Sequence, residues 1–241
     1  MISIIIPTLN EESVLESTLA HLCSGLKNTR YEIIISDGGS GDRTKEIAQR
    51  YTDKIVVYQE KKRQTIAQAR NMGADIASGD LLVFMDADVT IPDPDNFFKK
   101  TAKLFETRKN LLGLAVSLAV EKDKARLPDR VMFAIINANY ALFNNVLHIG
   151  AAAGEFQMVR ADAFKKLHGY REDLAAAEDN EFFYRLAKMG RTYVELKLIA
   201  YHSGRRIRKV GWPKLLCVWL INWFSMMLFK RSVSKEWKAI R

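Results

Sequence analysis

Four short apolar runs, separated by helical patterns, divide the first hundred residues of this chain. They cover residues 2–6, 31–36, 55–58 and 81–85, and the last helical pattern between them covers 64–78. Strands that are apolar at every position are buried on both faces, as in a parallel sheet covered by helices on each side. The pattern therefore predicts an α/β fold with a Rossmann-like, mostly parallel sheet.

The rest of the chain is less regular, but it continues as strands and helices. Its patterns predict a strand at 112–120, a long and mostly apolar segment at 130–149, a helix at 179–189 and short strands at 192–196 and 199–202. Neither a repeat nor a low-complexity linker interrupts it. We therefore expect one domain over residues 1–204, followed by a tail over 205–241.

The basic excess of the chain lies wholly in that tail. Residues 205–241 hold ten Lys or Arg and one acid, which equals the net charge of +9. A protein that binds nucleic acid along its body would carry the excess there, so we expect no such partner. Cys23 and Cys217 lie far apart in apolar helical patterns, which indicates a reducing compartment without structural disulfides. The apolar start, residues 1–7, is too short for a signal peptide.

Polar residues gather where three of the predicted strands end, at 7–11, 37–42 and 86–88. In a parallel sheet these ends share one rim, where ligands bind. Asp86 and Asp88 follow a buried strand and could together hold a hard divalent cation such as Mg²⁺ or Mn²⁺. The plain alternative is that both only cap a turn.

Asp37 stands at the tip of the second strand, where its carboxylate suits hydrogen bonding to a nucleobase or ribose. The glycines behind it read Gly38-Gly39-x-Gly41, which is not the dinucleotide-binding fingerprint. A phosphate loop ending in Lys-Ser or Lys-Thr is also missing from the sequence. Nicotinamide-dependent and NTPase functions are therefore not favoured.

Two further groups suit transfer chemistry. Glu178 and Asp179 begin a predicted helix, where a carboxylate is placed to act as a base, although the helix dipole is expected to keep its pKa low; a simple cap is the alternative. Arg205 and Arg206 suit a diphosphate, because a guanidinium donates two parallel hydrogen bonds, or else anionic lipid head groups. His202 is expected either in the core or beside the metal.

Six motifs in order resemble family 2 of the inverting GT-A glycosyltransferases, including its dolichol-phosphate-mannose-synthase-like and cellulose-synthase-like membrane-associated members. They run along nearly the whole chain and are Ile4-Ile5-Ile6-Pro7-Thr8-Leu9-Asn10-Glu11-Glu12, Ser36-Asp37-Gly38-Gly39-Ser40, Arg70-Asn71-x-Gly73, Phe84-Met85-Asp86-Ala87-Asp88, Gly154-x-Phe156-x-Met158-x-Arg160 and Glu178-Asp179. The resemblance implies a GT-A fold, a UDP- or GDP-sugar donor, Mg²⁺ or Mn²⁺, and inversion at the anomeric carbon.

The resemblance also implies roles for residues. Residues 1–110 would form the nucleotide-sugar and metal half of the domain and 111–204 the acceptor half. Asp179 stands in the position of the family's proposed base, with Glu178 beside it. We expect the metal at Asp86, Asp88 and His202, and the donor at Pro7, Thr8, Asn10, Glu11, Asp37, Arg70, Asp86, Arg205 and Arg206. Processive members carry Gln-x-x-Arg-Trp after the base; residues 205–212 lack that glutamine, which favours addition of a single sugar.

The tail has the composition of a helix at a membrane interface. Residues 215–229 are apolar except for Asn222 and Ser225, and as a helix they would extend roughly 22 Å, short of the ~30 Å hydrocarbon core. Tryptophans and cations flank them, namely Trp212, Trp219, Trp223, Lys230, Arg231, Lys235 and Lys238. We expect a peripheral or monotopic protein at the anionic cytoplasmic face of a membrane, or else a helix packed in a homodimer.

The apolar segment at 131–153 would border the acceptor site and favours a lipid-linked or glycan acceptor. Two other classes of function stay open on the sequence. A non-catalytic module that recruits a partner to membranes would explain the tail but leaves Asp37, Asp86, Asp88 and Asp179 without a purpose. A nucleotidylyltransferase would need a glycine-rich basic loop after the first strand, where this chain has Pro7-Thr8-Leu9-Asn10.

Overall fold

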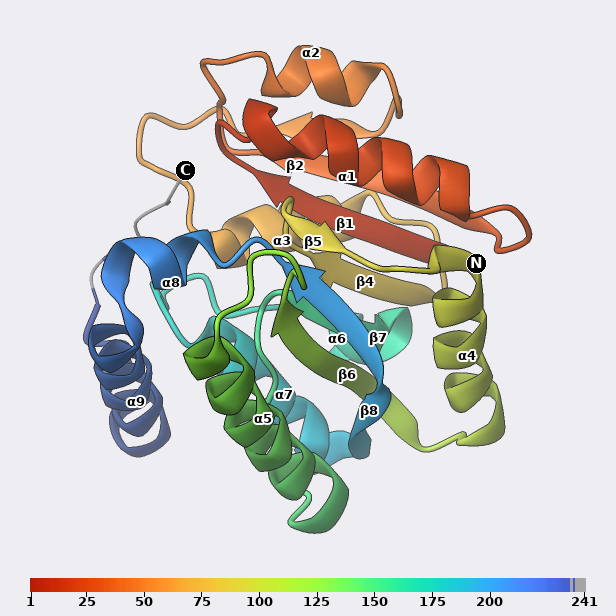
Figure 1. Cartoon of the computed structure of the whole chain (residues 1–241). Helices are drawn as coiled ribbons and strands as arrows, with labels where there is room; N and C mark the ends of the chain where they lie inside the picture. The colour runs from red at the N-terminus through yellow and green to blue at the C-terminus, as the bar shows by residue number, and fades with distance from the viewer. Residues whose placement is uncertain (235, 237–241) are drawn as a thin grey trace.

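The computed structural model describes residues 1–234 and residue 236, and these form one mixed sheet between two layers of helices (Figure 1). The sheet has eight strands in the order β3-β2-β1-β4-β7-β6-β8-β5. Of the tail's predicted cationic flank, Lys235 and Lys238 lie outside the described residues. The α/β fold expected from the sequence is confirmed.

The first half of the sheet is parallel, as predicted. It consists of β1 (Ile2–Thr8), β2 (Tyr31–Asp37), β3 (Ile55–Val57) and β4 (Leu81–Met85). The helices between these strands are α1 (Glu12–Gly25), α2 (Thr44–Gln49) and α3 (Ile66–Asp75). Thr8 pairs with Asp37 at the carboxyl ends of β1 and β2, so the first two polar loops start side by side.

The strands are apolar at every position because each faces two cores. Ile4, Ile6 and Val83 belong to one buried cluster, whereas Ile5 and Phe84 belong to another. Side chains alternate along a strand, so these clusters lie on opposite faces of the sheet. α1, α2 and α4 (Pro94–Thr107) cover the first face, and α3, α6 (Ala161–Lys166) and α7 (Glu178–Met189) cover the second.

The second half of the sheet departs from the parallel pattern. β7 (Phe156–Arg160) is antiparallel to β4 and to β6 (Leu111–Val120), while β6 is parallel to β8 (Arg191–His202). The two strands predicted at 192–196 and 199–202 are one strand, and the separate interpretation was wrong. A bulge opposite Val116 and Ser117 absorbs the extra residues between them. The short β5 (Val89–Thr90) pairs with the end of β8.

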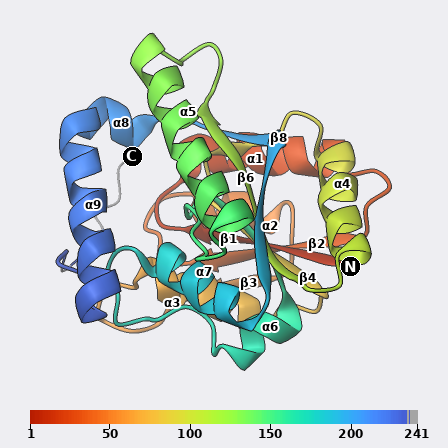
Figure 2. The ribbon, with the colours of Figure 1, turned by 90° about the horizontal axis from the view of Figure 1, so that it is seen from below.

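The predicted apolar segment at 130–149 is a helix, α5 (Leu127–Ala141), which continues into one π-helical turn over Leu142–Val146. After β8 the chain forms α8 (Arg205–Val210) and α9 (Trp212–Phe229). Figures 1 and 2 show α9 beside α5 at one end of the molecule. Phe143 and Trp223 stack across the two segments with ring centroids 6.1 Å apart.

α9 is longer than the sequence suggested. It has 18 residues, or about 27 Å at 1.5 Å per residue, because it begins at Trp212 with Pro213 in its first turn. Among the described residues, it is the one helix that is long and apolar enough to cross a membrane, judged by length and composition alone. Asn222 and Ser225 are 3% and 7% exposed, so these two polar residues face the protein, whereas Lys214 near the start of α9 is exposed.

Candidate functional site

A cavity of about 1150 Å³ opens at the carboxyl ends of β1 and β4, and side chains of α5 and α9 also line it. Most of the residues expected at the site line it: Pro7, Thr8, Glu11, Arg70, Asp86, Asp88, Glu178, Asp179, His202, Arg205 and Arg206. Asn10 and Asp37 are not among its lining residues. The fold thus brings together residues that are up to 199 positions apart, from Pro7 to Arg206.

Asp37 and Asn10 join the loops behind this cavity. Asp37 is fully buried, and its carboxylate accepts hydrogen bonds from Thr8 Oγ1 at 2.9 Å, Ser40 Oγ at 2.6 Å and the N–H of Ser40 at 2.8 Å. Asn10, with φ of 53°, accepts the N–H of Gly41 at 2.7 Å. These bonds fix the loops after β1 and β2 against each other; direct contact of Asp37 with a base stays a prediction.

Arg70 lies at the centre of an acidic cluster. Its side chain is 3% exposed, donates to Glu178 Oε1 at 2.8 Å and to the carbonyl of Gly154 at 2.9 Å, and lies 3.7 Å from Asp86 Oδ1. α3 can bring Arg70 here because Gly73 packs directly on β1, where a Cβ would stand 2.4 Å from Ile5 Cγ2. Arg70 therefore links the turn Asp86-Ala87-Asp88, which we call the metal turn after its predicted ligands, to the start of α7.

The acids around Arg70 carry more negative charge than it neutralises. Burial raises the pKa of Asp86 to about 7; Arg70 lowers this pKa, while Glu155, Asp88 and Glu11 raise it. Burial, as the largest cause, likewise raises the pKa values of Glu155 and Glu178 to about 7. Carboxylates crowded in this way favour a proton or a cation among them.

Asp179 lies one residue into α7, and Tyr140 and Glu155 stand near enough to interact with it electrostatically. Its Oδ1 accepts the backbone N–H of Asn180 at 2.7 Å. The expectation of a low pKa was wrong. Arg70 and the hydrogen bonds lower the pKa of Asp179, but burial raises it by more, so the net shift is upward. A base with a raised pKa takes a proton more readily near neutral pH.

Asp88 and His202 stand at the other side of the metal turn. Asp88 accepts hydrogen bonds from Ser203 Oγ and, at 3.1 Å, from Arg205 Nε. His202 accepts the N–H of Gly204 on Nδ1, while its Nε2 is buried without a hydrogen-bond partner among the described residues. Burial lowers the pKa of His202 and favours the neutral ring, whose proton lies on Nε2 because Nδ1 accepts a hydrogen bond. To bind a metal ion through Nε2, His202 would have to adopt the other tautomer and give up that hydrogen bond.

These residues fit a divalent cation. Burial and neighbouring carboxylates raise the pKa values of Asp86 and Glu155, which indicates a shortage of positive charge around them. Within the described part of the chain, no group of three or more acidic, His or Cys side chains stands ready to enclose a metal ion. Hard divalent cations prefer carboxylate oxygens such as those of Asp86 and Asp88, and in proteins they commonly also bind substrate phosphates.

The two predicted phosphate-binding arginines differ in their surroundings. Arg205 donates from Nη1 to Glu11 Oε2 at 2.9 Å and from Nε to Asp88, so it ties the first loop to the metal turn. Arg206 lines the cavity, and burial lowers its pKa. Both arginines line the cavity, so each stays a candidate for contact with an anionic ligand.

The far end of the cavity is apolar. Phe133, Ile136 and Phe143 line it from α5 and the π-helical turn, and Leu216, Trp219 and Trp223 line it from α9. The same cavity therefore offers carboxylates and arginines at one end and a hydrophobic wall at the other. A ligand with a polar reacting group and an aliphatic part would match both ends.

The sequence matches the family described as Glycosyl transferase family 2 over residues 3–168, more than half of the 241 residues. The chain belongs to this family. As a member it is 29% identical to the succinoglycan biosynthesis protein ExoA of Rhizobium meliloti over 196 residues, covering 78% of this chain and 58% of that protein. It is 36% identical to a dolichol-phosphate mannosyltransferase of Pyrococcus furiosus over 117 residues, covering 48% of this chain and 32% of that protein. The chain thus spans less than two thirds of these relatives.

Solved structures agree on the fold. A mannosyltransferase from Pyrobaculum calidifontis in complex with GDP-Man and Mn²⁺ superposes with a TM-score of 0.74 at 18% identity, over 95% of this chain and 64% of that one. S. aureus TarS in complex with UDP-GlcNAc superposes with a TM-score of 0.62 at 20% identity, over 83% of this chain and 57% of that one. The GT-A fold implied by the family resemblance is therefore confirmed.

Glu155 is the residue of the acidic cluster that the sequence interpretation missed. It occupies the variable position of the Gly154-x-Phe156 motif, and its carbonyl accepts the N–H of Asp86 at 3.3 Å. Because β7 runs antiparallel to β4, the residue before β7 meets the residue after β4. Only the direction of that pairing would have pointed to it.

Proposed function

We propose that this protein transfers a single sugar from a UDP- or GDP-sugar to a lipid-linked acceptor, with inversion and with the help of Mg²⁺ or Mn²⁺. One observation supports this above the others. The cavity places the acidic turn at Asp86 and Asp88, the cationic Arg206 and the carboxylate of Asp179 around a single space, next to an apolar wall. The relatives and the structural neighbours, which are named for mannosyl and other sugar transfer, support the reaction class.

Each residue has a distinct task in this proposal. Asp86 and Asp88, with His202 nearby, would hold the metal ion, which neutralises the diphosphate as it leaves. Arg205 or Arg206, which line the same cavity, would donate hydrogen bonds to this diphosphate. Asp179 would remove the proton from the acceptor hydroxyl as that oxygen attacks the anomeric carbon. Arg70 keeps Glu178 and Asp86 in place without touching the sugar.

The acceptor side suggests a lipid. The aliphatic part of the acceptor would lie against Phe133, Trp219 and Trp223, while its hydroxyl reaches Asp179. α9 turns a row of exposed apolar side chains outward, namely Leu220, Ile221, Phe224, Leu228 and Phe229. We propose that this face attaches the protein, as a peripheral or monotopic protein, to the anionic cytoplasmic face of a membrane.

Calorimetry tests the donor side. GDP or UDP is expected to bind in the presence of Mn²⁺ and to bind more weakly after chelation, because an ion held by Asp86 and Asp88 would offset the negative charge of the phosphates. Asp88→Ala is expected to abolish the Mn²⁺-dependent part of the binding. Asp75→Ala changes an exposed aspartate at the end of α3 and serves as the matched control. Failure of both nucleotides to bind in a metal-dependent way would refute the enzyme proposal.

A donor panel then separates the remaining functions. Release of sugar from UDP- or GDP-sugars by the wild type supports a transferase, whereas release of pyrophosphate from a nucleoside triphosphate would indicate a nucleotidylyltransferase. Binding to phosphatidylglycerol vesicles without any nucleotide binding would indicate a recruitment module. A dimer that persists in solution and does not bind vesicles would assign the outer face of α9 to a homodimer.

A further inference from the structure

The loop 171–177 leads directly to the proposed base. It joins Tyr170 to the first residues of α7, and its last residue, Ala177, has φ of 64°. L residues rarely adopt this left-handed conformation, so surrounding contacts must hold it in place. The position of Asp179 depends on those contacts, because Asp179 is only two residues further along.

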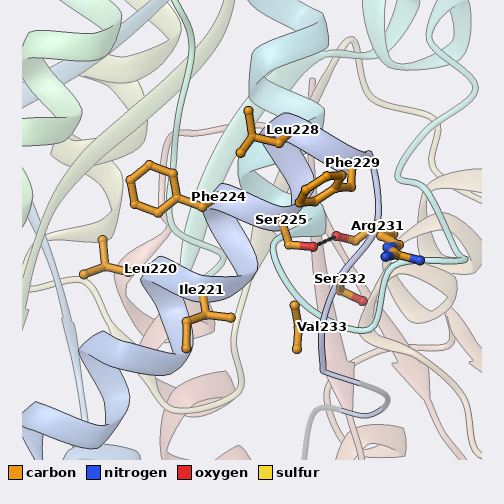
Figure 3. Close-up of a pocket in the computed structure, with 9 residues that line it drawn as sticks. All are labelled: Leu220, Ile221, Phe224, Ser225, Leu228, Phe229, Arg231, Ser232 and Val233. Atoms are coloured by element: carbon orange, nitrogen blue, oxygen red, sulfur yellow. Dashed lines mark hydrogen bonds between the residues drawn. The ribbon is translucent and has the colours of Figure 1, made fainter.

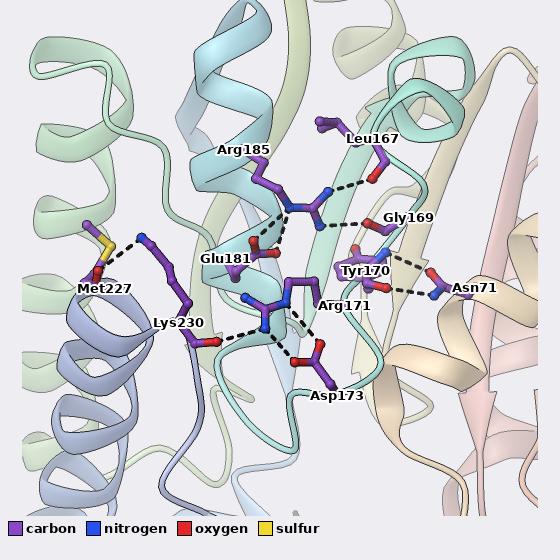
Figure 4. Close-up of polar contacts among 10 residues, drawn as sticks. All are labelled: Asn71, Leu167, Gly169, Tyr170, Arg171, Asp173, Glu181, Arg185, Met227 and Lys230. Carbon is purple, nitrogen blue, oxygen red and sulfur yellow. Dashed lines mark hydrogen bonds and ion pairs between the residues drawn. The ribbon is translucent and has the colours of Figure 1, made fainter.

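The start of this loop is braced from the body of the protein. Asn71 of α3 accepts the N–H of Tyr170 at 2.9 Å and donates to its carbonyl at 2.9 Å. Arg185 of α7 donates to the carbonyls of Leu167 and Gly169 at 2.7 and 2.8 Å. Figure 4 shows both braces on one side of Arg171.

The middle of the loop is held by the chain that follows α9. Arg171 donates from Nη2 to the carbonyl of Lys230 at 2.8 Å, while Asp173 fixes its guanidinium at 2.5 Å (Figure 4). The N–H of Ala175 donates to Ser232 Oγ at 3.2 Å. Residues 59 and 57 positions apart are joined here, so this is a tertiary contact and no feature of a local turn.

The segment 230–234 is in turn fixed to the inner face of α9. Asn222 accepts the N–H groups of Val233 and Ser234, each at 3.0 Å, and donates to Ser234 Oγ at 2.8 Å. Ser225 donates to the carbonyl of Arg231 at 2.8 Å (Figure 3). The two polar residues that interrupt an otherwise apolar helix are therefore used to hold the returning chain.

We propose that segment 230–234 is a latch through which α9 positions the loop 171–177 and, with it, Asp179. Ser232 and Arg171 are positioning residues in this proposal, because they act on the base through the loop. The inference rests on the proposed function in one respect, which is the role of Asp179 as the base. The contacts that form the latch stand independently of that role.

Amide hydrogen exchange measures the latch without any substrate. Ser232→Ala removes the acceptor of the Ala175 N–H, and Ser232→Thr retains a hydroxyl there. In Ser232→Ala, exchange over 172–177 is expected to rise about fivefold, as for the loss of one net hydrogen bond, and Ser232→Thr is expected to restore protection. Ser24→Ala is the control, because Ser24 is an exposed residue of α1 whose hydroxyl donates to the nearby carbonyl of His21.

Activity and binding complete the test. With the donor selected from the panel and a polyprenyl-linked acceptor, kcat of Ser232→Ala is expected to fall about fivefold. The Kd for GDP or UDP with Mn²⁺ is expected to stay within about twofold of the wild type, since the metal turn is untouched. Arg171→Met, combined with Ser232→Ala, is expected to increase the exchange over 172–177 further.

The latch is refuted if exchange over 172–177 is unchanged in Ser232→Ala and in the double variant. It is equally refuted if exchange in β1 and β4 rises to the same extent, because the substitutions then weaken the whole fold. A wild-type protein that binds neither GDP nor UDP with Mn²⁺ contradicts the proposed function alone, since the exchange result does not depend on it.

Discussion

Replacement of Arg70 by methionine tests the electrostatics of the site most directly. The guanidinium makes hydrogen bonds of 2.8 Å to Glu178 and 2.9 Å to the Gly154 carbonyl, and it lies 3.7 Å from Asp86. Methionine retains much of the length of the side chain but removes the charge and both hydrogen bonds. Glu178, which is 7% exposed, then lacks its cation in a buried position.

Removal of one partner of a buried ion pair costs about 3–5 kcal/mol of unfolding free energy. We expect about 3 kcal/mol at pH 7, because Glu178 can neutralise itself by taking up a proton. Burial and Asp179 already raise its pKa, against the opposing effect of Arg70. Without Arg70 the pKa rises further, so above pH 7 the variant keeps a proton that the wild type releases.

The sign of the pH dependence follows from this proton. A carboxyl group whose pKa is raised in the folded state loses stability as pH rises from its unfolded pKa to its folded pKa. As pH rises, Glu178 of the wild type ionises near pH 7, and its contribution to the loss of unfolding free energy then ends. The variant, with its higher pKa, continues to lose about 1.4 kcal/mol of unfolding free energy per pH unit. The difference between the two proteins is thus expected to widen from pH 7 to pH 8.

Guanidinium chloride unfolding, followed by tryptophan fluorescence at pH 6, 7 and 8, gives these free energies. Arg70→Met with Glu178→Gln is the matched control, since it removes the charge that Arg70 neutralises. It is expected to recover at least half of the loss and to remove the added pH dependence. A cost below about 1 kcal/mol, a constant difference across pH, or no recovery in the double variant would refute the reasoning.

Three further predictions concern stability and membrane binding. Burial raises the pKa of Glu32, but hydrogen bonds from one lysine and two serines lower it to about 2. Glu32→Gln should therefore cost about 2 kcal/mol of unfolding free energy at pH 7. In thermal unfolding, the stability difference between wild type and variant should close as pH falls from 4.5 through 2. Gly150→Ala should cost about 3 kcal/mol in denaturant unfolding, because φ is +82° and a Cβ would stand 2.2 Å from the Phe183 carbonyl. Leu228→Asp should reduce cosedimentation with phosphatidylglycerol vesicles, whereas Ile76→Asp, equally apolar and 41% exposed, should not.

Local patterns were enough to predict the first half of the sheet. Each of β1, β2 and β4 is apolar at almost every position and ends in polar residues, so periodicity alone placed Asp37 and Asp86 on one rim. The strand boundaries moved by one or two residues; β1 extends through Pro7 to Thr8, for example. The signal was strong because burial on both faces excludes polar residues from these strands.

Pairing between distant strands could not be predicted in this way. β7 joins β4 in the antiparallel direction, which places Glu155 beside Asp86, and no residue pattern in either strand states that direction. The pairing of Arg205 with both Glu11 and Asp88 is equally a tertiary outcome. Burial also overrode a local rule, because it raises the pKa of Asp179 where the helix dipole alone predicted a low one.

The two faces of α9 link the membrane to the base in the proposed arrangement. Its outer face exposes Leu228 and Phe229 by 70% and 65%, while its inner face holds segment 230–234 through Asn222. If a bilayer binds α9 more tightly when that segment is latched, it stabilises the loop before Asp179 by the same difference in free energy. Sugar transfer would then be favoured where the lipid-linked acceptor is found, although the bilayer touches neither Asp179 nor the metal turn.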